Sequence, residues 1–126
     1  MLGLTAISYG GIYDAKINLC DVKIGSHSAV TPAPRPDDWW TLRHQAILDR
    51  VKQGNVDLLM IGDSITHGWE GSGKQMWDKY YAGRNAVNMG FGGDQIQHVI
   101  WRLQNGEIDG INPKLAVIMI GTNNSN

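Results

Sequence analysis

Net charge is nearly absent from this sequence, and cysteine is scarce. Eleven Lys and Arg residues stand against twelve Asp and Glu residues, so the net charge is −1. This balance gives no electrostatic attraction to nucleic acid or to an anionic membrane surface. Cys20 is the single cysteine, which excludes a disulfide within the chain and a zinc site built from several cysteines.

Long apolar runs are missing too. No stretch approaches the ~20 apolar residues of a membrane-spanning helix. Residues 1–7 are apolar, but they have no basic start and are too few for the core of a signal peptide, so the default expectation is a cytoplasmic protein. The composition, 42% hydrophobic and 18% charged residues, is typical of a globular protein. A length of 126 residues corresponds to one domain or part of one.

Small polar loops follow three apolar segments of the chain. They begin at Gly62, Gly90 and Gly121, directly after the apolar segments 56–61, 86–89 and 115–120. Within these loops, Ser64 precedes Gly93 by 29 residues, and Gly93 precedes Asn123 by 30, close to the roughly 30 residues of a βαβ unit. Parallel strands place their carboxyl ends at one edge of a sheet, where open α/β folds bind ligands. A serine hydroxyl there can act as a nucleophile if a base removes its proton.

Four blocks of sequence resemble the SGNH (GDSL-type) hydrolase superfamily of esterases and lipases. Within it, they are similar to the catalytic subunits of platelet-activating-factor acetylhydrolases and their bacterial relatives. The blocks are Ile61-Gly62-Asp63-Ser64, residues 88–94, residues 97–107 and Gly121-Thr122-Asn123-Asn124. The resemblance covers residues 36–126. It implies an α/β fold, namely the N-terminal part of a flavodoxin-like three-layer sandwich with a parallel sheet.

The resemblance also implies a role for three residues. Ser64 would be the nucleophile, and its backbone N–H would face the oxyanion. Gly93 would donate a second backbone N–H, and Asn123 would donate from its side-chain amide. Such pre-aimed donors stabilise the negative charge of acyl transfer, typically by about 2.7–4 kcal/mol each. The expected substrate is a small-molecule ester with a short acyl group, such as acetyl, on a lipid or a carbohydrate. No cofactor or metal is needed.

One feature of the resembling family is missing from the sequence. Its members complete the catalytic triad with an Asp-x-x-His near the C-terminus, and no Asp-x-x-His occurs in these 126 residues. We therefore expect the chain to be the N-terminal part of a hydrolase domain, cut short and inactive by itself. His67 is the nearest histidine to Ser64 in sequence, but the non-catalytic interpretation is favoured, as it is for the helix residues His44 and His98.

The sequence divides near Pro32-Ala33-Pro34-Arg35-Pro36. Three prolines in five residues favour an extended linker. Residues 1–35 are predicted to be a β-rich segment and this linker, without an assigned function, and residues 36–126 to be the hydrolase part. Within the latter we expect helices at 39–53, around 76–81 and from residue 94 to 105, and strands at 56–61, 86–89 and 115–120.

Several side chains have predicted structural roles. Asp37 or Asp38 is expected to cap the first helix, Gly54 to end it, and Trp39 and Trp40 to anchor it to the sheet. Asp63 and Asp94 are interpreted as caps of helix N-termini rather than metal ligands. Gln97 is expected to be the capping-box partner of Asp94.

Two other functions are compatible with the sequence. The first is a non-catalytic α/β binding or interaction module, and an in-frame continuation containing Asp-x-x-His would argue against it. The second is a phosphate-binding domain that uses the loop 90–93 at a helix N-terminus. Phosphate binding without a reaction with a serine-directed phosphonate would favour the second. The sequence makes no prediction of the oligomeric state.

Overall fold

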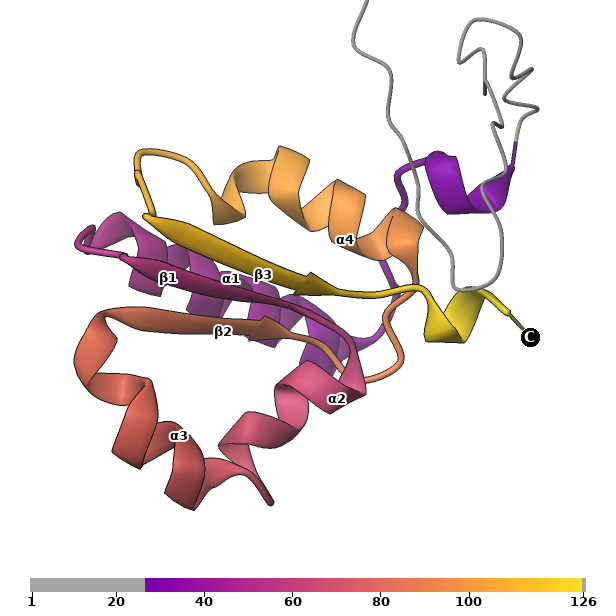
Figure 1. The fold of residues 1–126 in the computed structure, drawn as a ribbon. Helices are drawn as coiled ribbons and strands as arrows, with labels where there is room; N and C mark the ends of the chain where they lie inside the picture. The colour runs from indigo at the N-terminus through magenta and orange to yellow at the C-terminus, as the bar shows by residue number, and fades with distance from the viewer. Residues whose placement is uncertain (1–26, 126) are drawn as a thin grey trace, which may run out of the picture.

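A parallel sheet of three strands forms the centre of the structure, a computed structural model that describes residues 27–125 (Figure 1). Strand β1 (Leu58–Gly62) lies in the middle, between β2 (Ala86–Gly90) and β3 (Leu115–Met119). Both outer strands run parallel to β1. The predicted α/β fold with a parallel sheet is confirmed, and all three predicted strands are present.

Helices cover both faces of this sheet. Helix α1 (Asp38–Lys52) and helix α4 (Ile96–Arg102) lie on one face, and a π-helical turn, η4 (Leu103–Glu107), continues α4. Helices α2 (Ser64–His67) and α3 (Lys74–Tyr80) lie on the other face (Figure 1). This is the layered arrangement predicted for a flavodoxin-like sandwich. Short 3₁₀ turns complete the order of elements: η1 (Ser28–Val30), η2 (Gly68–Glu70), η3 (Ala82–Arg84) and η5 (Thr122–Asn124).

The hydrophobic core lies between the sheet and α1. All five residues of β1 are buried, as expected for a nearly continuous apolar strand that is covered on both faces. Helix α1 contributes Trp40, Ile47 and Val51, which recur at helical spacing on one face. Their partners in the core are Val56, Leu59, Ile61, Val87, Met89, Phe91 and Val99.

The helix termini follow the prediction only in part. Gly54 follows α1 with a φ of +67°, the left-handed conformation of a helix stop. The predicted capping box of Asp94 and Gln97 is wrong, because α4 begins two residues later, at Ile96. At the start of α4, the N–H of the N-cap residue Gln95 donates to His98 Nδ1 at 3.0 Å.

The proline-containing segment before α1 is extended and lies against the domain. The N–H of Ala33 donates to the carbonyl of Gln97 at 3.3 Å. Most of the predicted β-rich segment falls within residues 1–26, which lie outside the described residues. None of the helices in the described part of the chain combines the length and the apolarity needed to cross a membrane.

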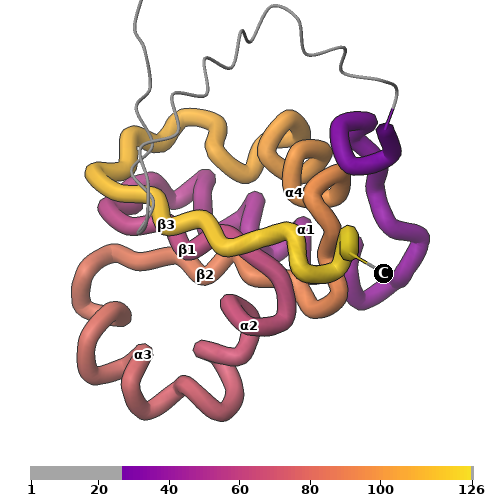
Figure 2. The backbone as a smooth tube through the Cα atoms, turned by 45° about the vertical axis from the view of Figure 1, so that its right-hand side comes forward, coloured from indigo at the N-terminus to yellow at the C-terminus, as the bar shows by residue number. Residues whose placement is uncertain are grey.

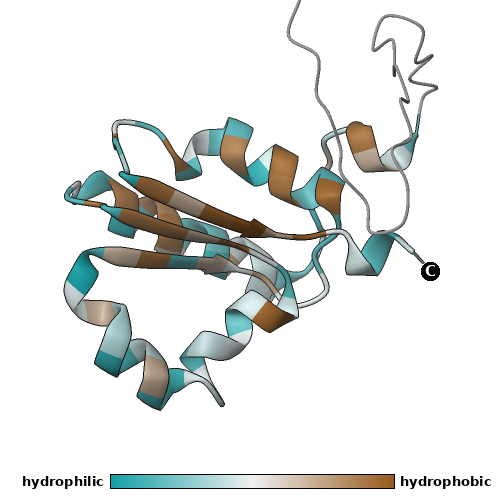
Figure 3. Ribbon diagram, in the orientation of Figure 1, coloured by the Kyte–Doolittle hydropathy of each residue, from teal (hydrophilic) through white to brown (hydrophobic). Residues whose placement is uncertain are grey.

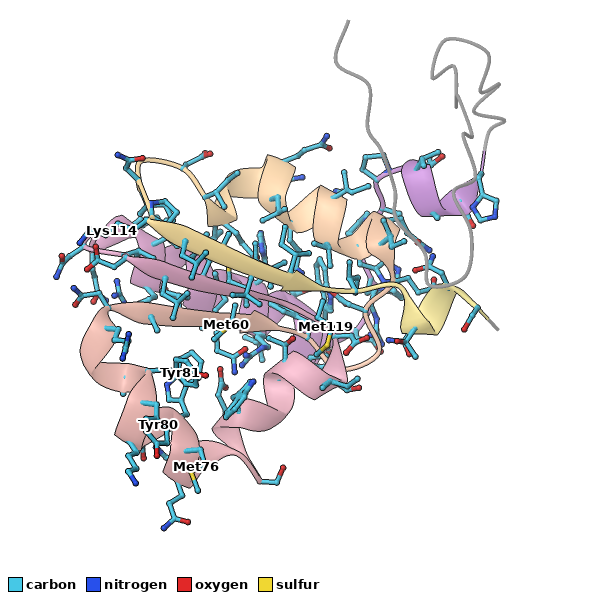
Figure 4. The ribbon with its side chains drawn as sticks, in the orientation of Figure 1. Met60, Met76, Tyr80, Tyr81, Lys114 and Met119 are labelled. Atoms are coloured by element: carbon cyan, nitrogen blue, oxygen red, sulfur yellow. The ribbon has the colours of Figure 1, made fainter. Side chains whose placement is uncertain are left out.

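Strand β3 is an apolar strand that is exposed on both of its faces. All five residues are exposed, and Ile118 retains 61% of its accessible surface. Figure 3 shows this strand as a continuous hydrophobic ribbon at the edge of the sheet, and Figure 4 marks its start near Lys114 and its end at Met119. Neighbouring side chains point to opposite faces, so neither face is covered within the described residues.

We predict that the 126-residue chain, expressed alone, has a low free energy of unfolding and self-associates. An exposed apolar edge strand is a template for pairing with another chain. Ile118→Glu should shift the chain toward monomer in analytical ultracentrifugation. Leu42→Glu is the matched control, because Leu42 is 71% exposed on α1, away from this edge. A cooperatively melting, monomeric wild-type chain would contradict the prediction.

Candidate active site

Ser64 lies at the carboxyl end of the central strand, as predicted. It is the first residue of α2 and is exposed. The preceding residue, Asp63, is buried, and its Oδ1 accepts from the N–H of Ile65 at 3.0 Å. The predicted helix-capping role of Asp63 is therefore confirmed. The cap fixes the turn from strand to helix and leaves the serine hydroxyl at the surface.

Helix α2 packs directly onto the end of β2. A Cβ atom on Gly90 would lie 2.1 Å from the backbone nitrogen of His67, a separation that only glycine avoids. Buried Asn88 joins the same elements: its amide donates to the carbonyl of Thr66 at 3.0 Å, and its Oδ1 accepts from the N–H of Gly90 at 2.8 Å. The helix that carries Ser64 is thus held against the strand that leads to Gly93.

Gly93 lies in the loop between β2 and α4. Its φ is +78°, in the left-handed region that side chains other than glycine rarely adopt. The guanidinium of Arg35 occupies the space beside it, with Nη1 3.0 Å from the position of a Cβ. One residue earlier, the N–H of Gly92 donates to His67 Nδ1 at 3.3 Å. This contact joins the Gly93 loop to the helix that carries Ser64.

Asn123 is bound to the same loop from the other side. Its Nδ2 donates to the carbonyl of Asp94 at 2.8 Å, and its own carbonyl accepts from Gln95 Nε2 at 2.7 Å. Next to it, Asn124 Oδ1 accepts from the N–H of Ile96 at 2.8 Å and so caps α4. An amide nitrogen carries two hydrogens, and the bond to the Asp94 carbonyl uses one of those of Asn123.

These contacts bring the three predicted site residues to one edge of the sheet. Ser64, Gly93 and Asn123 follow β1, β2 and β3 in turn, and the strands are parallel and in register, with Gly62 opposite Gly90 and Met119. Figures 1 and 2 show α2, the start of α4 and the C-terminal turn gathered at this edge.

A hollow of about 500 Å³ opens beside Ser64. Its lining is small or polar: Ser64, His67, Gly68, Glu70 and Gly71. Gly93 and Asn123 are not part of this lining. The arrangement offers a hydroxyl and a nearby space for part of a small molecule.

The carboxylate of Asp94 has a different role from the predicted one. It is fully buried, and it accepts from Trp40 Nε1 at 2.8 Å and from Arg102 Nε at 3.0 Å. The expectation that it caps a helix is wrong, since its oxygens accept from Trp40 and Arg102 and the N-cap of α4 is Gln95. Burial raises the pKa of this carboxyl, whereas the Arg102 charge and the hydrogen bonds from Trp40 and Arg102 act in the opposite direction.

Arg102 extends this contact into a buried chain of polar side chains. It is fully buried, and it donates to Glu107 and, at 3.3 Å, to the carbonyl of Met89. Glu107 Oε1 lies 2.8 Å from His44 Nδ1, and His44 is buried on α1. Sequence reasoning identified neither Arg102 nor Glu107, because charged residues are almost never fully buried unless paired.

His67 and His98 have hydrogen-bond partners other than Ser64 in the part of the chain that the structure describes. Burial, and then the charge of Arg43, lower the pKa of His67, while Glu70 acts against this shift. Burial likewise lowers the pKa of His98, against the pull of Asp94. In both rings Nδ1 accepts a backbone N–H group, which requires that this nitrogen carry no proton. No group of three His, Cys, Asp or Glu side chains that could hold a metal occurs in the described ranges.

Trp39 and Arg35 have contacts near the site that differ from their predicted roles. Trp40 anchors α1 in the core as predicted, but Trp39 is 41% exposed and stacks on His67, with 6.4 Å between ring centroids. Arg35, placed in a linker by its neighbouring prolines, donates from Nη1 to the carbonyl of Gly92 at 2.8 Å. The sequence carries no signal for this contact, because its partners are 57 residues apart.

Comparison with known proteins shows the family to which this chain is similar. Residues 60–126 match the family described as the GDSL-like Lipase/Acylhydrolase family. Platelet-activating factor acetylhydrolase IB subunit alpha1 of Rattus norvegicus is 36% identical over 105 residues, which are 79% of this chain and 44% of that protein. Subunit alpha2 of Homo sapiens is 38% identical over 88 residues, 70% of this chain and 38% of that protein. The chain thus spans less than half the length of these relatives.

We predict that Arg102→Met lowers the free energy of unfolding by about 3–5 kcal/mol, because it leaves buried carboxylates without their partner. Urea unfolding of the protein expressed from its complete gene measures the loss. Arg84→Met is the matched control, because Arg84 is exposed in η3, and its effect should stay within about 0.5 kcal/mol. Equal effects of the two substitutions would show that the buried network does not stabilise the fold.

Proposed function

Because this chain belongs to the GDSL-like lipase/acylhydrolase family, we propose that it supplies the nucleophile and the oxyanion-binding groups of a serine ester hydrolase. The observation that carries the proposal is the hydrogen bond from Asn123 Nδ2 to the carbonyl of Asp94. It ties the loop after β3 to the loop that holds Gly93, on the edge where Ser64 is exposed.

The proposed reaction has two steps. Ser64 Oγ attacks the acyl carbon of the ester, the bond to the alcohol oxygen breaks, and the alcohol leaves with a proton. Water then attacks the acyl-serine, which releases the acid and restores the hydroxyl. In both steps negative charge develops on the carbonyl oxygen, and the N–H groups of Ser64 and Gly93 and the amide of Asn123 would stabilise it.

Proton transfer needs a base that the proposal places outside these 126 residues. His67 and His98 use Nδ1 to accept backbone N–H groups, and His44 is bound to Glu107 in the core. A base must lie within hydrogen-bond reach of the proton that it takes, and these contacts favour structural roles for all three. His27 is the N-cap of η1, where its Nδ1 accepts from Ala29.

The proposed substrate is an ester of a short acyl group, such as acetyl, with a lipid or a carbohydrate alcohol. Two observations support the short acyl group. The relatives that match this chain are named acetylhydrolases. In addition, glycines and polar side chains line the hollow beside Ser64, whereas a site for a long acyl chain would be apolar.

We predict that Ser64→Ala abolishes hydrolysis of p-nitrophenyl acetate by the protein expressed from its complete gene. Asn123→Ala should lower kcat by about 10²–10³, the typical effect of losing one oxyanion donor. The rate should fall from acetate to octanoate esters. Steady-state kinetics measure all three effects, and undiminished turnover by Ser64→Ala would exclude the proposed nucleophile.

Asn124→Ala is the matched control for Asn123→Ala. It removes the neighbouring amide, which caps α4 through the N–H of Ile96, and so should lower stability by about 1 kcal/mol with little change in kcat. Equal losses of kcat in the two variants would mean that Asn123 acts only through the shape of its loop.

We also predict that the 126-residue chain alone has little or no esterase activity. Removing the histidine of a Ser-His-Asp unit lowers kcat on the order of 10⁶-fold. The comparison is the rate of the chain alone against that of the protein from the complete gene, with Ser64→Ala as the blank. Comparable, Ser64-dependent rates would place the base inside this chain and refute the prediction.

A further inference from the structure

We propose that Arg35 and His67 are positioning residues that clamp the Gly92–Gly93 backbone from two sides and thereby aim the N–H of Gly93. This inference rests on the proposed function, since it gives a direction to one of the oxyanion donors. It also assigns a role to the proline-containing segment, which lies before the residues that match the family.

The carbonyl of Gly92 and the N–H of Gly93 belong to one peptide unit. No peptide bond in the described residues is cis, and in a planar trans peptide the C=O and N–H point in opposite directions. Arg35 Nη1 donates to the Gly92 carbonyl at 2.8 Å. A carbonyl fixed in this way leaves the N–H of Gly93 pointing away from Arg35.

Arg35 is itself held in place. Its Nε donates to Asp37 Oδ2 at 2.9 Å, and its guanidinium lies over the Trp39 ring, 5.4 Å from the centroid. The buried carboxylate of Asp94 lies 3.8 Å from Nη1. These three groups orient a side chain that is 21% exposed. Gly93 needs this support, because glycine restricts its own backbone less than any other residue.

His67 holds the neighbouring peptide unit. Its Nδ1 accepts from the N–H of Gly92 at 3.3 Å, and its ring stacks on Trp39 at an interplanar angle of 20°. Trp39 therefore lies against both members of the clamp. Because Nδ1 can accept only when the ring is neutral, the clamp requires an unprotonated His67. The same residue is part of the one-turn helix that begins with Ser64, so it couples the nucleophile to the donor loop.

Arg35→Met tests the first half of the clamp in the protein expressed from its complete gene. A misaimed oxyanion donor weakens transition-state binding more than substrate binding. We therefore expect kcat to fall about 10- to 100-fold while KM stays nearly constant. This loss is no larger than the effect of removing one donor completely. Arg50→Met is the matched control, because Arg50 Nη1 also donates to a backbone carbonyl, that of Gly54, at 2.9 Å. Arg50 lies at the opposite end of α1, and its substitution should leave kcat unchanged.

His67→Asn and His67→Phe test the second half. Asparagine can place an acceptor near the position of Nδ1, whereas phenylalanine keeps a ring against Trp39 but has no acceptor. We expect His67→Asn to retain most of kcat and His67→Phe to lose it. The losses in Arg35→Met and His67→Phe should be non-additive in the double variant, because both act on one backbone segment.

A readout that does not depend on activity separates this inference from the proposed function. The NMR chemical shifts of the Gly92 carbonyl ¹³C and the Gly93 amide ¹⁵N should change in Arg35→Met and remain unchanged in Arg50→Met. If Ser64→Ala abolishes activity while Arg35→Met and His67→Phe leave it intact, the clamp is refuted and the proposed hydrolase function still holds. Unchanged shifts in Arg35→Met would overturn it regardless of activity.

Discussion

The buried ion pair between Arg102 and Asp94 is the interaction on which the rest of this structure depends. Both side chains are fully buried, so neither charge would be tolerated alone in the core. The pair joins α4 to the loop after β2, and the indole of Trp40 adds α1 to the same carboxylate. The conformation of Asp94 in turn places the carbonyl that Asn123 binds. A contact in the core therefore sets the geometry of the surface edge.

The proposed site is held together by side chains that contact backbone groups. Arg35 and His67 bind the two polar groups of Gly92, Asn88 bridges β2 and α2, and Asn123 bridges the loops after β2 and β3. Backbone N–H groups make good oxyanion donors only when their direction is fixed beforehand. A glycine loop has little intrinsic preference, so the surrounding side chains must supply that direction. This explains why a site of three residues depends on elements from the whole described chain.

Residues in short local patterns were predicted well. The three strands show as short apolar segments of the sequence, and the position of Ser64 after β1 and the capping role of Asp63 follow from their near neighbours in sequence. Asp94 shows the limit of such reasoning. A carboxylate two residues before a helix has the same local appearance whether it caps the helix or pairs with an arginine. Here the N–H of Ile96 is satisfied by Asn124, 28 residues away, which frees the Asp94 carboxylate for Trp40 and Arg102.

The sequence alone therefore indicated the α/β architecture, because strand periodicity and motif spacing are properties of order along the chain. Its resemblance to the SGNH hydrolases pointed to the family and to the three candidate residues Ser64, Gly93 and Asn123. The tertiary structure decided what orients them. Arg35 reaches Gly92 across 57 residues, and His67 reaches it across 25. Such contacts arise from parallel strand pairing and close packing at Gly90, where a Cβ would collide with α2. The order of residues along the chain shows neither this strand pairing nor this close packing.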